Sequence, residues 1–578
     1  MNNLHDDEPL DDEQRAAVEA SDKAIAVLAG PGSGKTRTLS HRARQLLAQD
    51  PGSRALLITF TNKAAAEMKT RALRFGNLDV DRIQAGTFHH FGLSLLRSIH
   101  GKLVGIAPDV DILDAEEAKQ FAGEVAAVAG VPYSWQEWSE CRLRGDEPRS
   151  DVAAFGDAYE AAKREENVVD FDDLVAYPAR ILDEHPQVAE LYGTRYPHVL
   201  VDEFQDTNPT HFAIVRALCP YAKTISVFAD DDQAIMRFAG ADAENIRRFI
   251  EELGARELSL STNYRCREEI VHHGNLLIAA NRDHSGRTMT AHRTGGSVEL
   301  RRFASEAAEA RAITDEVAAM VLRDENPVPP ASIAVLVRNG PRANVLVQTL
   351  RRRKLPVTDW RGAAYDTDDR RVFRTCMSAL RPRLGGWQAA QLAKLLETEP
   401  ARERNTHAFL EAHEDHPVAA ALLALRDRAF EGAPPSQLAE QARQAIVAHD
   451  AALGERAKAI VDAVADFERH DANFTIDHLL SELALKSGGR PPTEGGGVKV
   501  ASLHGTKGLE WPIVYLVGLE QGKLPDYRAI KDGTVGDERR TCFVGVCRAE
   551  DELIVTLSRD VNGWGQDPSQ FLREMELI

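Results

Sequence analysis

The sequence is poor in cysteine and has no long apolar stretch. Its 578 residues include six cysteines, at positions 141, 219, 266, 376, 542 and 547, and no two of them form a CxxC pair. This scatter indicates neither a disulfide framework nor a zinc site, and it is typical of a protein in a reducing cytoplasm. No apolar run approaches the length needed to span a bilayer, and the N-terminus lacks the basic-then-apolar order of a secretion signal. We therefore expect a cytoplasmic protein without a membrane partner.

A surplus of basic residues is also missing. Lys and Arg number 70 against 89 Asp and Glu, which gives a net charge of −19. Such a balance argues against a protein that coats nucleic acid non-specifically, although it leaves room for a narrow basic channel on an acidic surface. The composition, 43% hydrophobic and 28% charged, is that of a globular protein, and the length predicts three or four compact units.

The most informative stretch is the glycine-rich loop Ala29-Gly-Pro-Gly-Ser-Gly-Lys-Thr36. It follows an apolar run, 24–28, and precedes a segment with helical character, 37–47. This order predicts a phosphate-binding loop, because glycines turn backbone N–H groups inward around an anion and the helix N-terminus adds partial positive charge. Lys35 is expected to reach the β- and γ-phosphates, and the Thr36 hydroxyl to hold Mg²⁺. A glycine-rich turn without a ligand has roughly one chance in twenty in this context, so the sequence predicts a nucleoside triphosphate site.

Acidic and amide side chains follow two later predicted strands. The run His198-Val-Leu-Val-Asp-Glu203 reads as a strand that ends in two carboxylates. Because burying an unpaired charge is costly, a functional explanation is favoured by roughly ten to one. We expect Asp202 to hold the water shell of Mg²⁺ opposite Thr36, and Glu203 to orient and deprotonate the attacking water. After the strand 224–228, Gln233 is a candidate γ-phosphate sensor.

Further positions are candidates for contacts to the nucleotide. Gln14 lies upstream of the loop, where its amide would match the edge of adenine, although a solvated helix glutamine is the plainer explanation. The aromatic ring of Tyr264 would stack on adenine, and the neighbouring guanidinium of Arg265 would pair with a phosphate. Arg548 belongs to a second α/β unit, and it would act as an arginine finger if that unit faces the nucleotide.

Two turns at predicted strand ends carry aromatic residues. Phe60 ends the strand 55–60, and Phe88 and His89 follow a strand that begins at 83, where an open α/β sheet places its ligands. These rings would stack on nucleic-acid bases, but core packing explains each of them alone better, by about three to one.

The series of motifs from Gln14 to about residue 557 resembles that of superfamily 1 DNA helicases of the UvrD/Rep/PcrA type. The resemblance covers nearly the whole chain, and an ordered series is far more specific than any one motif in it. It implies an α/β fold with two RecA-like parallel-sheet motor domains, each with an inserted mainly helical subdomain. It also implies ATP and Mg²⁺ as cofactors, and single-stranded DNA and tailed duplex DNA as binding partners.

The alternation of predicted strands and helices is interrupted where such inserts are expected. It is lost between 98 and 165, and again between 376 and 494, where alanine and leucine recur with helical periodicity. The predicted boundaries are 1–97 and 166–272 for the first motor domain with the ATP site, 98–165 for its insert, 273–375 and 495–578 for the second motor domain, and 376–494 for its insert.

The resemblance also implies roles for individual residues. Gln14 would read adenine, Tyr264 would stack on it, and Glu510 would contact the ribose. Arg265 and Arg548 would be γ-phosphate arginines from opposite lobes. The implied nucleotide-binding set is Gln14, Ala29, Gly30, Pro31, Gly32, Ser33, Gly34, Lys35, Thr36, Arg37, Tyr264, Arg265, Glu510 and Arg548; the catalytic set is Lys35, Glu203, Gln233, Arg265 and Arg548; and the metal ligands are Thr36 and Asp202. The implied DNA contacts are Phe60, Thr61, Asn62, Thr87, Phe88, His89, Phe238, Arg338 and His504.

The chain departs from the family pattern in the stretch that follows the predicted γ-phosphate sensor. Met236 stands where the family usually has a tyrosine, and Ala239 where it has an arginine. Losing one aromatic platform costs about 1–3 kcal/mol of base stacking, so a weaker grip on DNA is expected. Phe543 and Cys547 replace the usual tyrosine and threonine near Arg548.

Two functions of different classes are compatible with the sequence. The first is an ATP-dependent 3′–5′ DNA helicase or translocase that hydrolyses ATP while moving on single-stranded DNA, in DNA repair, replication restart or defence. The second is a DNA-sensing ATPase subunit that regulates a separate nuclease or effector, its protein partner, in an antiviral defence system. A helicase–nuclease fusion is disfavoured, because the roughly thirty residues after Arg548 are too few for a domain.

Overall fold

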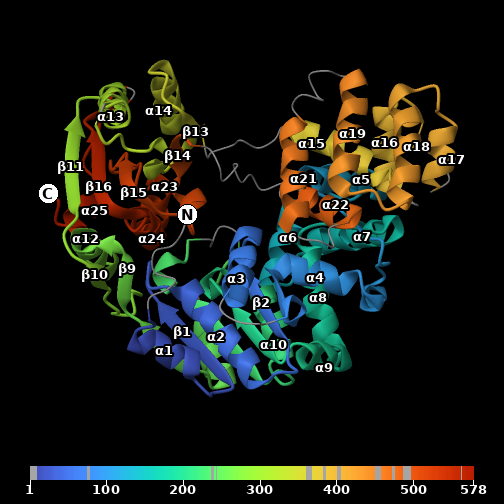
Figure 1. Ribbon diagram of the computed structural model, residues 1–578, viewed down its shortest axis with the longest axis horizontal. Coiled ribbons are helices and arrows are strands. Elements are labelled where there is room, and N and C mark those ends of the chain that lie inside the picture. Colours follow the sequence, from blue (N-terminus) through green and yellow to red (C-terminus); the bar gives the residue numbers. More distant parts are fainter. Residues whose placement is uncertain are drawn as a thin grey trace.

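Two parallel β-sheets, each with six strands, organise the protein (Figure 1). The computed structural model describes residues 9–74, 79–235, 240–242, 244–323, 325–359, 367–381, 386–399, 405–449, 457–470, 475–485, 496–561 and 563–578. Within this part of the chain, the predicted α/β class with two parallel sheets is confirmed.

The first sheet forms from short apolar runs with helices on both faces. Its strands are β1 (Ala24–Ala29), β2 (Ala55–Thr59), β3 (Ile83–Thr87), β6 (His198–Val201), β7 (Thr224–Ala229) and β8 (Arg256–Leu260), in the order β3-β2-β6-β7-β1-β8. Alternate residues of β1 enter different cores: Ile25 and Val27 pack on the side of α1 (Asp12–Glu19), α2 (Lys35–Gln49) and α3 (Asn62–Arg74). Strands buried on both faces read as continuous apolar runs, which is why they were predictable.

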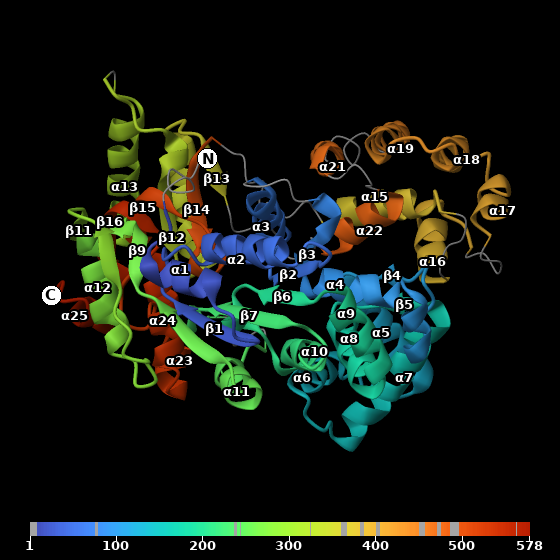
Figure 2. The same cartoon turned by 60° about the horizontal axis from the view of Figure 1, so that its bottom comes forward.

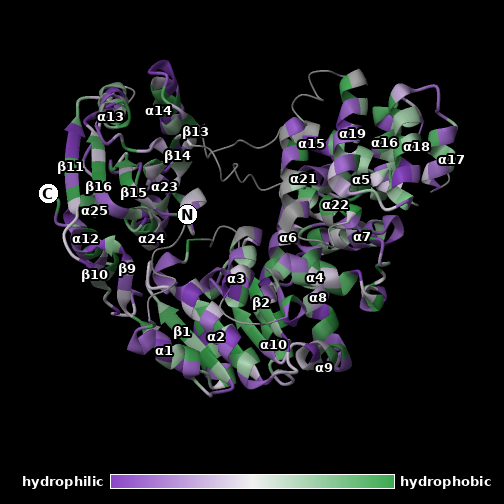
Figure 3. Ribbon diagram, in the orientation of Figure 1, coloured by the Kyte–Doolittle hydropathy of each residue, from purple (hydrophilic) through white to green (hydrophobic). Residues whose placement is uncertain are grey.

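The opposite face of this sheet carries a second layer of helices. Ala26 and Leu28 of β1 pack there with residues of α4 (Phe88–Leu96), α8 (Asp173–Glu184), α9 (Pro186–Arg195), α10 (Pro209–Leu218) and α11 (Glu244–Leu253). We call the first sheet with these two helical layers the first unit. Figure 3 shows its strands β1 and β2 largely in hydrophobic colours.

The second unit repeats this layered arrangement. Its strands are β11 (Ser297–Phe303), β12 (Ile333–Val337), β13 (Val357–Asp359), β14 (Val498–Ser502), β15 (Trp511–Val517) and β16 (Ala549–Ser558), in the order β11-β16-β15-β12-β14-β13. Helices α13 (Glu306–Val321) and α14 (Gly340–Arg352) cover one face. Helices α12 (Glu268–Ala279), α24 (Val535–Val546) and α25 (Gln570–Glu574) cover the other.

Strand β9 (Thr262–Arg267) connects the two units. It pairs in parallel with β10 (Thr290–Arg293), and its Cys266 is fully buried in the core of the second unit. At the same time the Tyr264 N–H donates to the carbonyl of Gly32 in the first unit, at 2.9 Å. A movement of one unit relative to the other therefore acts directly on β9.

Two helical segments lie beside each other at one end of the molecule (Figure 2). The first consists of α5 (Ala115–Ala129), α6 (Trp135–Arg144) and α7 (Ser150–Glu166), and the second of α15 (Thr367–Ser378), α16 (Gly386–Leu395), α17 (Thr406–Glu411), α18 (Pro417–Phe430), α19 (Pro435–His449), α21 (Lys458–His470) and α22 (Ile476–Leu485). From Phe373 onward, buried apolar residues of α15 belong to the core of the second segment. The domain boundaries drawn from the sequence stay predictions.

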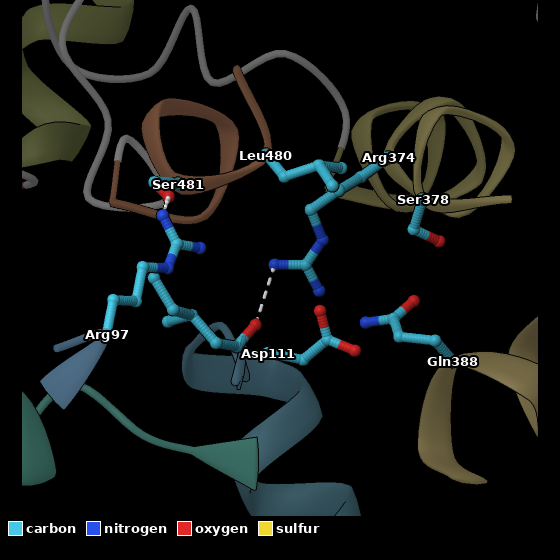
Figure 4. Close-up of a pocket in the computed structure, with 8 residues that line it drawn as sticks. Arg97, Asp111, Arg374, Ser378, Gln388, Leu480 and Ser481 are labelled. Atoms are coloured by element: carbon cyan, nitrogen blue, oxygen red, sulfur yellow. Dashed lines mark hydrogen bonds between the residues drawn. The ribbon is translucent and has the colours of Figure 1, made fainter. Parts of the chain in front are cut away.

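Buried ion pairs join the two helical segments. Arg374 of α15 pairs with Glu117 of α5, and it donates to the carbonyl of Ile112 at 3.1 Å. Arg381 pairs with Asp111, which Figure 4 shows facing Arg374 across a small polar pocket. The carboxylates lie on or just before the first segment, and the guanidinium groups on or just after α15, so the charges of the two segments are complementary.

Further short elements occur in the described part of the chain. They are β4 (Asp111–Ile112) with β5 (Val168–Val169), β17 (Asp560–Val561) with β18 (Trp564–Gly565), and α23 (Tyr527–Asp532). All six cysteines are free thiols. None of the helices in the described ranges is long and apolar enough to cross a membrane.

Candidate nucleotide and nucleic-acid site

Three neighbouring strands of the first sheet end at the candidate site. In the order β6-β7-β1, the carboxyl end of β6 leads to Asp202, that of β7 to Asp230, and that of β1 into the loop 29–36. Parallel strands place their carboxyl ends at one edge of the sheet, where open α/β folds bind ligands. The predicted loop and the predicted carboxylates therefore meet.

The loop needs glycine at two positions. Gly32 and Gly34 have φ angles of 69° and 81°, in the left-handed region that favours glycine. A Cβ at Gly32 would lie 2.7 Å from the Cβ of Arg265, and a Cβ at Gly34 would lie 2.8 Å from Nε2 of Gln14. Glycine thus provides both the backbone turn and the close approach of two predicted nucleotide-binding residues.

Lys35 is buried against this loop. Its Nζ donates to the carbonyl oxygens of Ala29, at 2.9 Å, and Gly30, at 3.1 Å, and it lies 3.4 Å from Oδ2 of Asp230. Because Gly34, the N-cap residue of α2, has no side chain, it leaves the N–H groups of the first helical turn to another acceptor. A buried cation beside a helix N-terminus suits a phosphate group.

Thr36 and Asp202 form the predicted metal-binding pair. The Thr36 hydroxyl donates to Oδ2 of Asp202 at 3.0 Å. Burial, together with the charge of the adjacent Glu203, raises the pKa of Asp202 to about 7. A hydroxyl and a carboxylate in contact beside a phosphate loop are the protein ligands with which Mg²⁺ is held at nucleotide sites, so these residues fit that ion.

Glu203 has an unusual backbone and a charged environment. Its φ of 54° is uncommon for a residue other than glycine, and such conformations cluster at functional sites. Gln205 donates to its Oε2 at 2.5 Å. Burial opposes ionisation of Glu203, but the charges of Lys507 and Lys35 outweigh it and hold its pKa below the usual value. Glu203 is therefore ionised at neutral pH, which is the form that can accept a proton.

The second unit reaches this site through Arg548 and Lys507. Arg548 Nη2 donates to Oε1 of Gln233 at 2.9 Å. Burial lowers the pKa of Arg548 to about 10, which leaves it a cation at neutral pH. Lys507 forms an ion pair with Asp206, and its Nζ donates to the carbonyl oxygen of Gln233 at 3.1 Å. Sequence reasoning missed Lys507, although it stands in the Gly-Thr-Lys-Gly run that follows His504.

The residues that are predicted to contact adenine and ribose lie beside the loop 29–36. Gln14 is buried, and its Nε2 donates to the carbonyl of Ser33 at 3.0 Å. Tyr264 donates its hydroxyl to Asp11, the N-cap residue of α1, at 2.5 Å. Arg265 forms an ion pair with Glu510 of the second unit. The contact between Asp11 and Tyr264 joins residues 253 positions apart, and no local sequence pattern indicates it.

Two of the predicted DNA contacts of the first unit, Phe60 and Phe88, belong to an aromatic cluster. Phe88 is 1% exposed and packs against Phe60 at 5.8 Å and His211 at 4.4 Å, measured between ring centroids. Core packing, the alternative considered for Phe88, is therefore what the structure shows, whereas Phe60 and His89 are partly exposed. Thr87 caps α4 through a hydrogen bond from the N–H of His90 at 3.1 Å.

The other predicted DNA contacts are spread over both units. Thr61 and Asn62 are partly exposed at the start of α3. In the second unit, Arg338 pairs with Glu538 at 2.7 Å. Burial and the charge of Arg338 lower the pKa of the adjacent His504 to about 4, so its ring is neutral. Phe238, with the departures Met236 and Ala239, lies outside the described residues.

Two family models match the chain. The UvrD/REP helicase N-terminal domain matches residues 10–254, and the UvrD-like helicase C-terminal domain matches 258–365 and 412–560. DNA helicase II of Salmonella typhimurium (strain LT2) and of Escherichia coli (strain K12) are each 28% identical to this chain, over 98% of it and 87% of the relative. ATP-dependent DNA helicase PcrA of Staphylococcus aureus (strain Mu50) is 25% identical, over 98% of this chain and 86% of the relative. Since the models of both halves match in order and cover most of its length, the chain belongs to the UvrD-like family of ATP-dependent DNA helicases.

Proposed function

We propose that the protein is an ATP-driven 3′–5′ DNA helicase or translocase, which moves on single-stranded DNA in DNA repair, replication restart or defence. The observation that carries this proposal is the 2.9 Å hydrogen bond from Arg548 of the second unit to Gln233 of the first. Gln233 also donates to Asp230, the partner of Lys35, at 2.5 Å. Three contacts, Lys35–Asp230, Asp230–Gln233 and Gln233–Arg548, therefore connect this lysine to the second unit.

The residues at the loop divide the work of hydrolysis. Lys35 and the N–H groups of α2 would bind the phosphates, and Thr36 and Asp202 would hold Mg²⁺, which neutralises developing charge on the phosphate oxygens. Glu203 would accept the proton of the attacking water on a carboxylate oxygen, because Lys507 and Lys35 keep it ionised.

Coupling to movement follows from the contacts between units. Arg548 gains a charge-assisted contact to the γ-phosphate only if the second unit approaches the first, so the triphosphate favours the closed arrangement and the diphosphate does not. Single-stranded DNA lying across Phe60 and His89 of the first unit, and Arg338 and His504 of the second, would then be gripped and released in turn. The predicted boundaries make these units the two motor domains and the helical segments their inserts.

Strand displacement, with ATP turnover followed in the same tubes, tests the proposal. The substrates are duplexes that carry a 3′ or a 5′ single-stranded tail. Displacement of the 3′-tailed duplex alone is expected. Displacement from the 5′ tail alone would contradict the proposed direction. Turnover that DNA stimulates without any displacement would favour the second function, a DNA-sensing ATPase subunit with a nuclease or effector partner.

A further inference from the structure

Two carbonyl groups of the phosphate loop are bonded to β9, the strand that connects the two units. Nδ2 of Asn263 donates to the carbonyl oxygen of Pro31 at 2.8 Å, and the N–H of Tyr264 donates to that of Gly32 at 2.9 Å. Carbonyl oxygens elsewhere in the loop accept from side chains of the first unit. A carbonyl oxygen repels an anion, so a phosphate loop must turn its N–H groups, and not its carbonyl groups, toward the phosphate. By engaging two carbonyl groups, β9 therefore contributes to the anion-binding shape of the loop.

Asn263 also shapes β9 itself. Its side chain is fully buried, and Oδ1 accepts from the N–H groups of Arg265, at 3.0 Å, and Cys266, at 2.7 Å. An asparagine that bonds the backbone two and three residues further along the chain imposes a local turn. This turn orients Arg265, whose guanidinium pairs with Glu510 of the second unit. One amide group thus acts on the phosphate loop and on the strand that carries a predicted γ-phosphate arginine.

The amide of Asn263 lies between the loop of the first unit and a helix of the second. A Cβ at Gly32 would lie only 2.9 Å from Oδ1 of Asn263, so the loop backbone is in direct contact with the amide. On the side of the second unit, Nδ2 lies 3.7 Å from Sδ of Met289, which packs against the core of that unit. The N–H and carbonyl of Met289 are bonded to the side chain of Asn275 on α12, at 3.1 Å and 2.9 Å. A displacement of the second unit therefore acts on Asn263 and, through it, on the loop.

We propose that Asn263 is a positioning residue for ATP, which holds the phosphate loop in its anion-binding shape and ties that shape to the placement of Arg265. It acts through the carbonyl of Pro31 and the N–H of Arg265, and not on the reacting atoms. Pro31 is buried, so without Nδ2 of Asn263 its carbonyl oxygen would lack a donor, and the loop would rotate to find one. This inference rests on the proposed function, because that function assigns the triphosphate to the loop.

Competition binding to the purified full-length chain tests the action on the loop. A fluorescent ATP analogue is displaced with ATP, with ADP and with inorganic triphosphate, each with Mg²⁺. Asn263→Ala should weaken binding of all three by about tenfold, because a buried acceptor is left unsatisfied. Inorganic triphosphate has no base, so weaker binding of this ligand points to the loop and not to stacking on Tyr264. Unchanged affinities for all three ligands would overturn the inference.

Two further variants separate positioning from a general loss of stability. Asn281→Ala is the matched control, since Asn281 is buried and its Nδ2 donates to the carbonyl of Gly536 at 3.3 Å, a bond that does not involve the loop. It should leave the three affinities unchanged, and an equal loss in this variant would refute a specific role of Asn263. Asn263→Asp keeps the shape and the Oδ1 acceptor but loses the donor to Pro31. It should raise KM for ATP while lowering kcat less than Asn263→Ala does, because the turn that orients Arg265 is kept. Equal kcat values of the two variants would contradict the tie to Arg265.

Lys35→Ala distinguishes failure of this inference from failure of the proposed function. This variant removes the cation that is bonded to the loop and should lose most of its affinity for all three ligands. If Lys35→Ala binds them as tightly as the unmodified chain, the loop is not the phosphate site, and the proposed function fails together with the inference. If Lys35→Ala loses binding and Asn263→Ala does not, the inference alone is wrong, and the proposed function stands.

Discussion

At the residue scale, two adjacent carboxyl groups at the end of β6 are driven apart in their proton affinity. Burial and the charge of Glu203 raise the pKa of Asp202 to about 7. The cations Lys507 and Lys35 overcome burial at Glu203 and lower its pKa. Neighbouring acids with opposite shifts commonly have different roles, one as a ligand and the other as a base. The second unit supplies Lys507, so part of the positive charge that lowers the pKa of Glu203 is present only when the two units are close.

Glu203→Gln should abolish ATP turnover while leaving ATP binding intact. The amide has the shape of the carboxylate but cannot take the proton of the attacking water. Steady-state turnover and the affinity for a fluorescent ATP analogue measure the two effects separately. Glu251→Gln, an exposed carboxyl on α11 that pairs with Arg247, is the control and should change neither. Normal turnover by Glu203→Gln would remove Glu203 from the role of base.

Arg548→Ala should slow hydrolysis by on the order of 10³-fold or more, because an arginine finger stabilises charge that develops in the transition state. Single-turnover measurements at saturating ATP separate this effect from weaker binding. Arg528→Ala is a suitable comparison, since Arg528 is exposed on α23 beside Tyr527 and lies in the same unit. An effect of Arg548→Ala no larger than that of the comparison would mean that the second unit does not complete the site.

At the element scale, the contact between α5 and α15 depends on buried charges. Arg374→Ala would leave Glu117 buried without its partner, and removing one member of a buried pair destabilises by about 3–5 kcal/mol. We expect α15 to separate from α5, so that amide hydrogens at this contact exchange faster. Hydrogen–deuterium exchange read by mass spectrometry localises the change.

Lys119→Ala is the matched control for this contact. Lys119 lies on the same helix, α5, and pairs with Glu116 at 2.7 Å, with side chains 47% and 52% exposed. Solvent screens such a pair, which contributes about 0–1 kcal/mol. Exchange near α15 should therefore stay unchanged in Lys119→Ala. Equal effects of the two substitutions would show that the buried pair does not hold the segments together.

Local patterns predicted several of the strands and helices, but not the contacts between them. The apolar runs 55–60 and 224–228 predicted strands that the structure bounds as Ala55–Thr59 and Thr224–Ala229. Helix α14 begins at Gly340, because Pro341 is tolerated in a first helical turn, where its missing N–H has no partner to lose. The Lys507–Asp206 pair joins residues 301 positions apart, and no local pattern carries that information.

At the scale of the whole molecule, the net charge of −19 sets a condition on DNA binding. A basic path across an acidic protein attracts DNA mainly through a few phosphate contacts, each of which releases counterions. The logarithm of the binding constant for a single-stranded oligonucleotide should therefore fall linearly with the logarithm of the salt concentration, with a slope of about −0.7 for each phosphate neutralised. Fluorescence anisotropy between low and moderate salt measures this slope. A slope near zero would indicate that base stacking alone holds the strand.

A double-mutant cycle on Gln233 and Arg548 tests whether the contact between the two units couples them energetically during ATP turnover. Each single change, Gln233→Ala or Arg548→Ala, breaks the same 2.9 Å contact between the units. Residues that act through one contact give non-additive effects, so the double variant should be little slower in ATP turnover than Arg548→Ala alone. Pairing Arg548→Ala with Phe60→Ala, at a predicted DNA contact that lacks a bond to Arg548, provides an independent pair for comparison. If the Gln233 and Arg548 effects simply multiply, the contact between the units does not transmit the state of the nucleotide, and stepping along DNA would need another connection.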